Sequence, residues 1–344
     1  GGTTTGDNNI AIGASAGTAL TTADNNVAIG YQALTQHVDG GLNIAIGFKA
    51  MDETAGTNAA ASVSNIAIGV DALGGDWADA DSNYNIAIGN YTMDAVLNDA
   101  NSNVAVGYGA LGELTEADGT IAIGHNALRA LTSGAGNTAV GYQAGLYVTT
   151  GARSTFVGYA AGQGITGTKL TGADNTAVGQ NAGLLLQGAA TSNTLVGSGA
   201  GDSVTTGDSN VAIGKGAMST ENTGDKNVAI GDNAGSALTT SGENVIIGSY
   251  AVGTGVLTGA QNVAIGRLAG QDLTSAAGNV IIGRSAAQQA TTSDGNVIIG
   301  DGAVQVGVLT GNDNVVIGQG AGVDLTSAAQ NTIIGEQSGA QITT

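Results

Sequence analysis

A five-residue block of alternating character, Asn-Val-Ala-Ile-Gly or a close variant, recurs 19 times along the 344 residues of the chain. The glycines that close the blocks are Gly13, Gly30, Gly47, Gly69, Gly89, Gly107, Gly124, Gly141, Gly158, Gly179, Gly197, Gly214, Gly231, Gly248, Gly266, Gly283, Gly300, Gly318 and Gly335. Fifteen of the eighteen intervals between them are 17 or 18 residues long. A period this short indicates one small structural unit stacked on copies of itself. We number positions in each repeat from this block glycine, position 0.

Each block predicts a short β-strand. Position −3 is always β-branched, position −1 is always Ile or Val, and position −2 between them is Ala in twelve repeats. This is a three-residue segment of period 2 with two apolar faces. A helix is excluded because β-branched residues disfavour it and each interior glycine would cost about 1 kcal/mol.

The second half of each repeat carries Ala at +3 in 17 of 19 repeats, and many repeats add an apolar residue at +7. Examples at +7 are Leu20, Leu131, Val148, Leu238, Leu273 and Leu325. A cluster of Thr, Gly, Asp and Asn then predicts the turn into the next block. Two short strands and two turns per repeat predict an all-β fold, a parallel β-solenoid (β-roll) of about 19 coils. We expect residues 1–344 to form one continuous array, a segment of a longer fibre protein without capping repeats.

Position −4 is Asn in 17 of the 19 repeats, the exceptions being Thr120 and Ser154. Asn side chains one layer apart can hydrogen-bond into a ladder. The predicted ladder includes Asn26, Asn43, Asn65, Asn85, Asn103, Asn210, Asn227 and Asn244. The block glycine is expected at a corner where a side chain would clash or φ is unusual.

The position −2 column suggests more than one chain. If Val and Ile at −3 and −1 point into the coil, position −2 points out. There the column replaces Ala by larger residues, namely Phe156, Leu195, Ile246, Ile281, Ile298, Val316 and Ile333. An apolar column along an outer face requires a partner. We therefore expect a symmetric homo-oligomer, with a lone solenoid as the alternative.

Composition narrows the function. The chain has 60 glycines, no cysteine, 8 basic and 27 acidic residues, and a net charge of −19. This charge argues against nucleic acid as a partner, and the lack of an 18-residue apolar stretch argues against membrane insertion. His37 and His125 stand far apart, and no nucleophile, phosphate-loop or metal motif is present. We therefore expect no enzymatic activity, no cofactor and no metal. Acids share one turn position, as turn-forming residues do: Asp7, Asp24, Asp118, Asp208, Asp225 and Asp294.

Three longer intervals place surplus residues at 52–64, 74–84 and 161–174, which are predicted to be side loops. Loop 74–84 holds the only tryptophan, Trp77, with Asp76, Asp79 and Asp81. It is either a ligand contact or Ca²⁺ site, or a loop whose Trp77 covers the neighbouring coil. Residues 255–284 match 307–336 at an offset of 52, a tandem duplication of three coils.

An aromatic column stands at +1, where Tyr108, His125, Tyr142 and Tyr159 fall in consecutive coils. In a parallel solenoid these rings would stack about 4.8 Å apart. They form either a strip on which sugars stack or a ladder that shields the backbone.

The block Asn-x-Ala-Ile-Gly-x-x-Ala, in Asn26–Ala33, Asn210–Ala217 and Asn227–Ala234, resembles the head repeat of YadA-type trimeric autotransporter adhesins. Asn137–Gly151 is similar to repeats of bacteriophage tail fibres and related surface fibres. The resemblance implies a left-handed parallel β-roll that assembles as a homotrimeric rod. The period here is longer than that of the adhesin heads, so the extra residues are expected to lengthen a turn.

Three functions fit this pattern. The leading hypothesis is the structural shaft of a trimeric fibre, most simply a bacteriophage tail fibre that spaces a receptor-binding tip from the particle. The first alternative is an adhesin head that binds a cell-surface glycan or receptor through its coils or through loops 74–84 and 161–174. The second alternative is a subunit of an end-to-end filament. All three place the chain on a virion surface or outside the cell.

Overall fold

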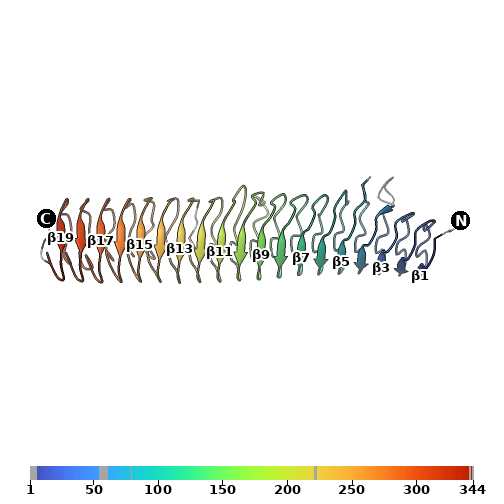
Figure 1. Ribbon diagram of the computed structural model, residues 1–344, viewed down its shortest axis with the longest axis horizontal. Helices are drawn as coiled ribbons and strands as arrows, with labels where there is room; N and C mark the ends of the chain where they lie inside the picture. Colours follow the sequence, from blue (N-terminus) through green and yellow to red (C-terminus); the bar gives the residue numbers. More distant parts are fainter. Residues whose placement is uncertain (1–5, 54–60, 79, 221–222, 341, 343–344) are drawn as a thin grey trace. The chain divides into compact units, whose positions relative to one another are not determined.

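The computed structural model describes residues 6–53, 61–78, 80–220, 223–340 and 342. These residues form strands and turns, and none of them lies in an α-helix. The chain divides into two compact units, Gly1–Asn175 and Thr176–Thr344. Each unit is a parallel β-solenoid in which every coil contributes one strand (Figure 1), so the predicted fold class is confirmed.

The strands are three residues long and follow the blocks. The first unit holds β1 (Ile10–Ile12), β2 (Val27–Ile29), β3 (Ile44–Ile46), β4 (Ile66–Ile68), β5 (Ile86–Ile88), β6 (Val104–Val106), β7 (Ile121–Ile123), β8 (Thr138–Val140) and β9 (Thr155–Val157). The second holds β10 (Thr176–Val178), β11 (Thr194–Val196), β12 (Val211–Ile213), β13 (Val228–Ile230), β14 (Val245–Ile247), β15 (Val263–Ile265), β16 (Val280–Ile282), β17 (Val297–Ile299), β18 (Val315–Ile317) and β19 (Thr332–Ile334). Within a unit each strand pairs with the next in exact register by block position, Ala28 opposite Ala45 for example.

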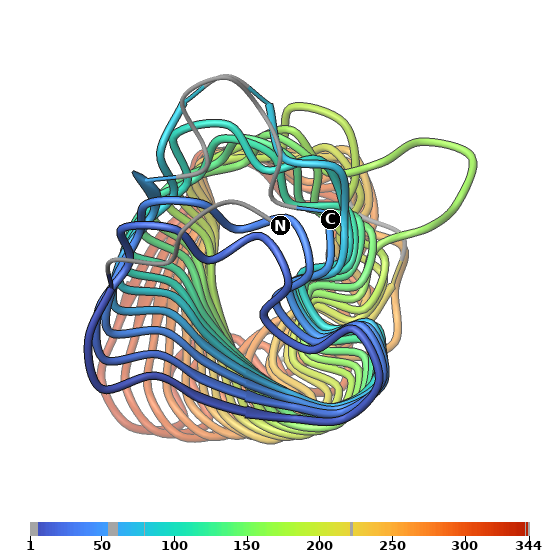
Figure 2. The same ribbon diagram turned by 90° about the vertical axis from the view of Figure 1, so that its right-hand side faces the viewer.

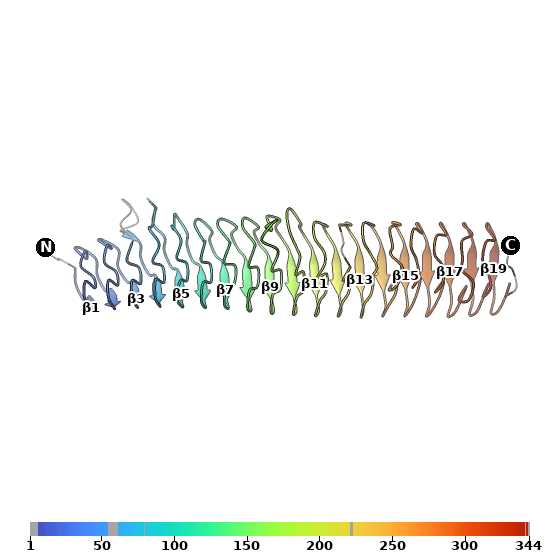
Figure 3. The same cartoon turned by 180° about the vertical axis from the view of Figure 1, so that it is seen from behind.

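The second strand expected in each coil is not present among the described residues. Only two isolated bridges, Val148 with Leu170 and Leu238 with Leu257, occur outside the named strands. The backbone instead takes positive φ at +2 and +4, as at Gln32 (φ 56°) and Leu34 (φ 52°), so it turns rather than extends. Each such non-glycine residue costs about 1–2 kcal/mol, which burial of the +4 side chain offsets. The turns stack on one another in each unit, as the view from behind also shows (Figure 3).

The strand faces are the reverse of those predicted. Position −2 points into the coil: Ala28, Phe156 and Ile246 are fully buried. Positions −3 and −1 flank it on the outside and are half-buried or exposed in every strand. The column that broadens from Ala to Ile is therefore the interior of the solenoid and not an oligomer axis. The interior also takes up Ala at +3 and the apolar residue at +7.

Positions −2 and +4 share the interior space, and a large residue at −2 is never combined with Leu or Met at +4. In coils β2 to β7, Ala at −2 is combined with a large buried residue at +4. These +4 residues are Leu34, Met51, Leu73, Met93, Leu111 and Leu128. Where position −2 is larger, +4 shrinks, because core space is filled only once.

Phe156 shows this exchange most clearly. A Cβ added at Gly162, position +4 of the same coil, would overlap the Phe156 ring. One added at Gly145, the equivalent residue of the preceding coil, would lie 3.0 Å from Cδ2 of Phe156. In the second unit, Gly183 and Gly201 border Leu195 in the same way.

The Asn at −4 connects three segments of backbone. The N–H and Nδ2 of Asn26 both donate to Oδ1 of Asn9 in the preceding coil, at 2.9 and 3.2 Å. Nδ2 also donates to the carbonyl of Gly40 in the following turn, at 3.1 Å. Equivalent N–H bonds of 2.9–3.1 Å join Asn43, Asn65, Asn85, Asn103, Asn210, Asn227 and Asn244 to the preceding Asn.

A second ladder runs along the acidic turn position, −6. Oδ1 of Asp24 accepts the N–H of Asp7, and Oδ1 of Asp225 accepts the N–H of Asp208 at 2.8 Å. These carboxylates thus bond to the preceding coil and not only shape their own turn. Their direction is opposite to that of the Asn ladder, in which each side chain accepts from the following coil.

The block glycine is a corner, as predicted. Gly283 has φ 139°, and an added Cβ would overlap the carbonyl of Gly300 in the next coil. Only glycine allows two coils to approach this closely at that dihedral.

Of the three predicted side loops, the one at 161–174 leaves the coil and exposes residues 166–169. It is the yellow-green loop that projects from the first unit in the view along the stack (Figure 2). Most of the predicted loop at 52–64 lies outside the described residues.

The exchange of core volume predicts a compensating pair. Phe156→Ala should lower the free energy of unfolding by about 3–5 kcal/mol, because it leaves a cavity. Gly162→Leu alone should lower it by about 1–3 kcal/mol through overpacking. The double variant should be more stable than Phe156→Ala alone, because Leu34 shows that position +4 accepts Leu at φ 52°. Urea unfolding of the four proteins measures the coupling, and additive losses would contradict the exchange.

Candidate functional site

Four rings at +1 form a stacked ladder on the surface of the first unit. The ring centroids of Tyr108 and His125 are 5.2 Å apart, those of His125 and Tyr142 5.1 Å, and those of Tyr142 and Tyr159 5.2 Å. The planes of successive rings are within 8–17° of parallel. The spacing follows from in-register coils, in which each +1 residue lies above the last.

The stacking decides between the two hypotheses for this column. Each face of His125 and of Tyr142 is covered by a neighbouring ring about 5 Å away, which leaves no room for a sugar ring. The hypothesis that sugars stack along the whole strip is therefore wrong for these two residues. The ladder presents ring edges and phenol hydroxyls to solvent, with Tyr142 42 % and Tyr159 54 % exposed.

Three further rings make contacts besides these four. Tyr91, one position off the column at +2, meets Tyr108 edge-on at 5.6 Å and 74°. Tyr31 and Phe48, both at +1, form a second stacked pair at 5.4 Å. Their shared position in consecutive coils was a sufficient signal for the second pair, whereas the offset of Tyr91 gave none.

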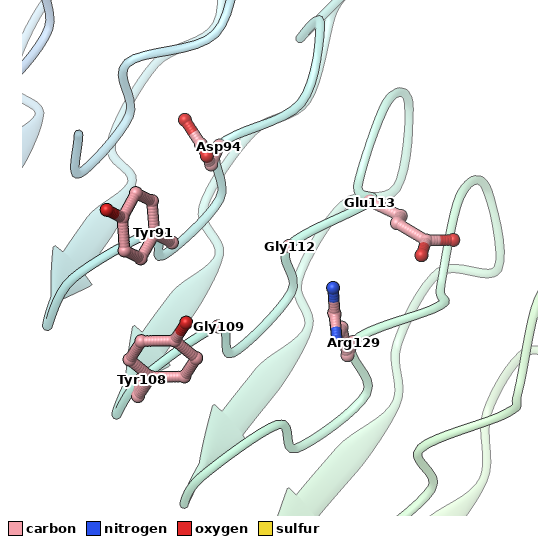
Figure 4. Close-up of a pocket in the computed structure, with 7 residues that line it drawn as sticks. All are labelled: Tyr91, Asp94, Tyr108, Gly109, Gly112, Glu113 and Arg129. Atoms are coloured by element: carbon pink, nitrogen blue, oxygen red, sulfur yellow. The ribbon is translucent and has the colours of Figure 1, made fainter.

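Two hollows lie beside the ladder. The first, of about 290 Å³, is lined by Tyr91, Asp94, Tyr108, Gly109, Gly112, Glu113 and Arg129 (Figure 4). The second, of about 270 Å³, shares Glu113 and Arg129 and adds Asn126, Ala130, Gln143, Leu146, Tyr147 and Lys169. Because Glu113 and Arg129 line both hollows, the two hollows are adjacent, and together they extend across several coils. We call the two hollows together the lateral groove.

Asp94 is the most perturbed carboxyl of this groove. Partial burial, together with the smaller effect of the nearby charges of Asp71, Asp52 and Glu53, raises the pKa of Asp94 to about 6. Lys49 pairs with Asp52 at 3.1 Å and not with Asp94. Asp94 therefore takes up a proton in mildly acidic solution.

Trp77 is not a surface contact. Its side chain is buried, and Nε1 donates to the carbonyl of Leu73 at 3.2 Å. It fills the interior where loop 74–84 passes over the coil, which is the second of the two hypotheses for this loop. Burial raises the pKa of Asp81, whereas Asp76 is exposed and Asp79 lies outside the described residues. Among the described residues, no group of three metal-binding side chains occurs.

The outside of the strands carries two columns, Val or Ile at −1 in every coil and Val, Ile or Thr at −3, with Thr in β8–β11 and β19. Most of these side chains are half-buried by their neighbours in the column. Ile88, Ile121, Ile123, Val140 and Ile213 are 36–40 % exposed. We call these two columns the outer strand face. It recurs in every coil of both units.

His37 is a buried titratable group within the Asn ladder. Nδ2 of Asn43 lies 3.0 Å from Nε2 of His37 and donates its other hydrogen to the carbonyl of Ser62 at 2.9 Å. Because Nδ2 can only donate, Nε2 of His37 accepts and is unprotonated. Burial lowers the pKa of His37 to about 4, against a weaker raising effect of the bonds to Gly40 and Ser62.

This burial predicts a loss of stability in acid. The pKa of His37 is about 4 in the folded chain and 6.5 when unperturbed, so the folded state binds fewer protons. Its contribution is complete above pH 6.5 and is lost as pH falls toward 4. Between pH 7 and 4.5, His37→Gln should lose roughly 2–3 kcal/mol less free energy of unfolding than the parent. Gln keeps an acceptor for Asn43, and urea unfolding at both pH values gives the comparison. Equal losses in the two proteins would contradict a buried neutral His37.

No helix able to cross a membrane occurs among the residues that the structure describes. Comparisons of the chain with protein-family models, with curated proteins and with solved structures give no match. The resemblance to adhesin heads and tail fibres therefore remains a prediction based on the block residues.

Proposed function

We propose that this chain is the structural shaft of a homotrimeric fibre on a virion or cell surface, most simply a bacteriophage tail fibre. The observation that carries the proposal is the outer strand face. Its Val and Ile side chains stay in contact with solvent in every coil of both units. The apolar column at −1, flanked at −3 by Val or Ile in fourteen of the nineteen coils, calls for a protein partner.

A second copy of the same chain is the simplest partner. The two columns lie about 7 Å apart, at two residues' separation along a strand. A strip this narrow and regular suits packing against identical strips around an axis. The resemblance of Asn26–Ala33 to the adhesin heads supports three copies. The proposed axis lies on positions −3 and −1, and not on position −2, where the sequence pattern predicted it.

A structural role agrees with how the chain is stabilised. Hydrogen bonds in both ladders join one coil to the next, so added coils extend the stack without a new cross-section. The tandem copies at 255–284 and 307–336 are additions of this kind.

An adhesin head is the second candidate. The lateral groove and the exposed rings at +1 favour it, because they place polar and aromatic side chains on the coil surface. An adhesin would bind its target through the coils themselves, and a shaft would leave binding to a separate tip.

Light scattering tests the oligomer. We expect a trimer of about 99 kDa, three copies of 33.1 kDa. Ile213→Lys combined with Ile265→Lys should convert it to a monomer, because three ammonium groups would meet at each position of the axis. The matched control, Ser209→Lys with Gln261→Lys, changes position −5, where Lys226 already occurs, and should remain trimeric.

A monomeric parent protein would contradict the proposal. Open-ended growth in mass would favour the end-to-end filament instead. A parent trimer that survives both outer-face substitutions would show that the outer strand face is not the axis.

A further inference from the structure

Cations in this chain are few, and half of them are already paired. Against 27 acidic residues there are 8 Lys and Arg. Ion pairs occupy four of them, Lys49, Arg153, Lys226 and Arg284. Arg129 and Lys169 form no ion pair with a described residue, and both line the second hollow of the lateral groove. With Glu113 as the one carboxylate in its lining, this hollow has a net positive charge, which favours an anionic ligand.

Amide side chains complete this hollow. Oε1 of Gln143 accepts Nε2 of Gln163 at 2.8 Å, which orients the Gln143 amide and leaves its Nε2 as a donor. Asn126 is 92 % buried, since 8 % of it is exposed, and its Oδ1 has no hydrogen-bond partner among the described residues. A buried amide without a partner is unusual, because leaving it unpaired costs about 1–3 kcal/mol.

The first hollow extends the site with a different chemistry. Arg129 stands beside the backbone at Gly112, with the Tyr91 and Tyr108 rings on the neighbouring coils (Figure 4). Tyr91 meets Tyr108 edge-on and is 41 % exposed, so at least one face of its ring has no aromatic neighbour. Asp94 and Glu113 offer acceptors for hydroxyl groups on the same surface. A pyranose has an apolar face, which can pack on the Tyr91 ring, and hydroxyl groups at its edge, which can bond to the carboxylates and the guanidinium.

We propose that the lateral groove binds an anionic oligosaccharide. A carboxylate or sulfate on one sugar pairs with Arg129 and Lys169, and a hydroxyl of that sugar accepts from Nε2 of Gln143. A neighbouring sugar packs on the open face of Tyr91. Nucleic acid does not fit, because a polyphosphate needs a row of clustered cations and the lining of this groove holds two, Arg129 and Lys169. This goes beyond the shaft proposed above, because it places a ligand on the side of the coils.

A glycan array tests this inference. The purified chain is applied to oligosaccharides that carry uronic acid, sialic acid or sulfate, each printed beside its neutral counterpart. We expect retention on at least one acidic glycan and at least tenfold less on its neutral counterpart. The class retained distinguishes a carboxylate from a sulfate. Titration with that glycan should show Kd raised at least tenfold by Arg129→Gln and by Lys169→Gln.

Lys215→Gln is the matched control. Lys215 is exposed and lies in the second unit, so the same loss of charge should leave Kd unchanged. Light scattering on each variant distinguishes a loss of glycan binding from a loss of the oligomer, because the groove substitutions should not change the mass. Retention on no acidic glycan, equal retention on neutral ones, or an Arg129→Gln variant with the parent Kd would each overturn the proposal.

Discussion

The structure depends on one interaction, the hydrogen bonding of the Asn at −4, present in 17 of the 19 coils, to the neighbouring coils. Oδ1 of each Asn accepts from the following coil, and Nδ2 reaches a carbonyl of the next turn. In the observed register, the buried amides have their hydrogen-bond partners. A shift of one residue between neighbouring coils would leave several buried polar groups unpaired. The ladder therefore fixes the register that every other column follows. It also makes each coil depend only on its neighbours.

Register has consequences for the surface as well as for the core. It places the rings of His125 and Tyr142 at contact distance from their neighbours, and it aligns Val and Ile into the outer strand face. It also brings residues of several coils, such as Tyr91, Arg129 and Lys169, to one lateral groove. Assembly through the strand and ligand binding beside the ladder thus use different columns of the same repeat. A fibre could carry both functions without a change in its fold.

Much of this could be predicted from the sequence, because a fixed period converts positions into columns. The strands, the Asn ladder, the glycine corner and the stacked rings all follow from spacing alone. Spacing alone did not predict which face of the strand points inward, because apolar residues occur at all three positions, −3, −2 and −1. The deciding signal was the exchange between −2 and +4, seen where Phe156 is combined with Gly162. The prediction of a second strand was wrong because the backbone takes positive φ at +2 and +4, where residues such as Gln32 and Leu34 give no turn signal. The lateral groove joins positions +1 to +11 of different coils, which no local pattern reveals.

Amide hydrogen exchange resolved to single residues tests the coil-to-coil ladder most directly. The account predicts protection that recurs with the 17–18-residue period, at −4, −3 and the block glycine. Asn227, Val228 and Gly231 donate there to neighbouring coils at 2.8–3.0 Å. The backbone N–H groups of Tyr142 and Lys215, both at position +1, bond to no described residue and should exchange fast. Protection without this period, or fast exchange at Asn227 in the folded chain, would contradict the ladder as the basis of the fold.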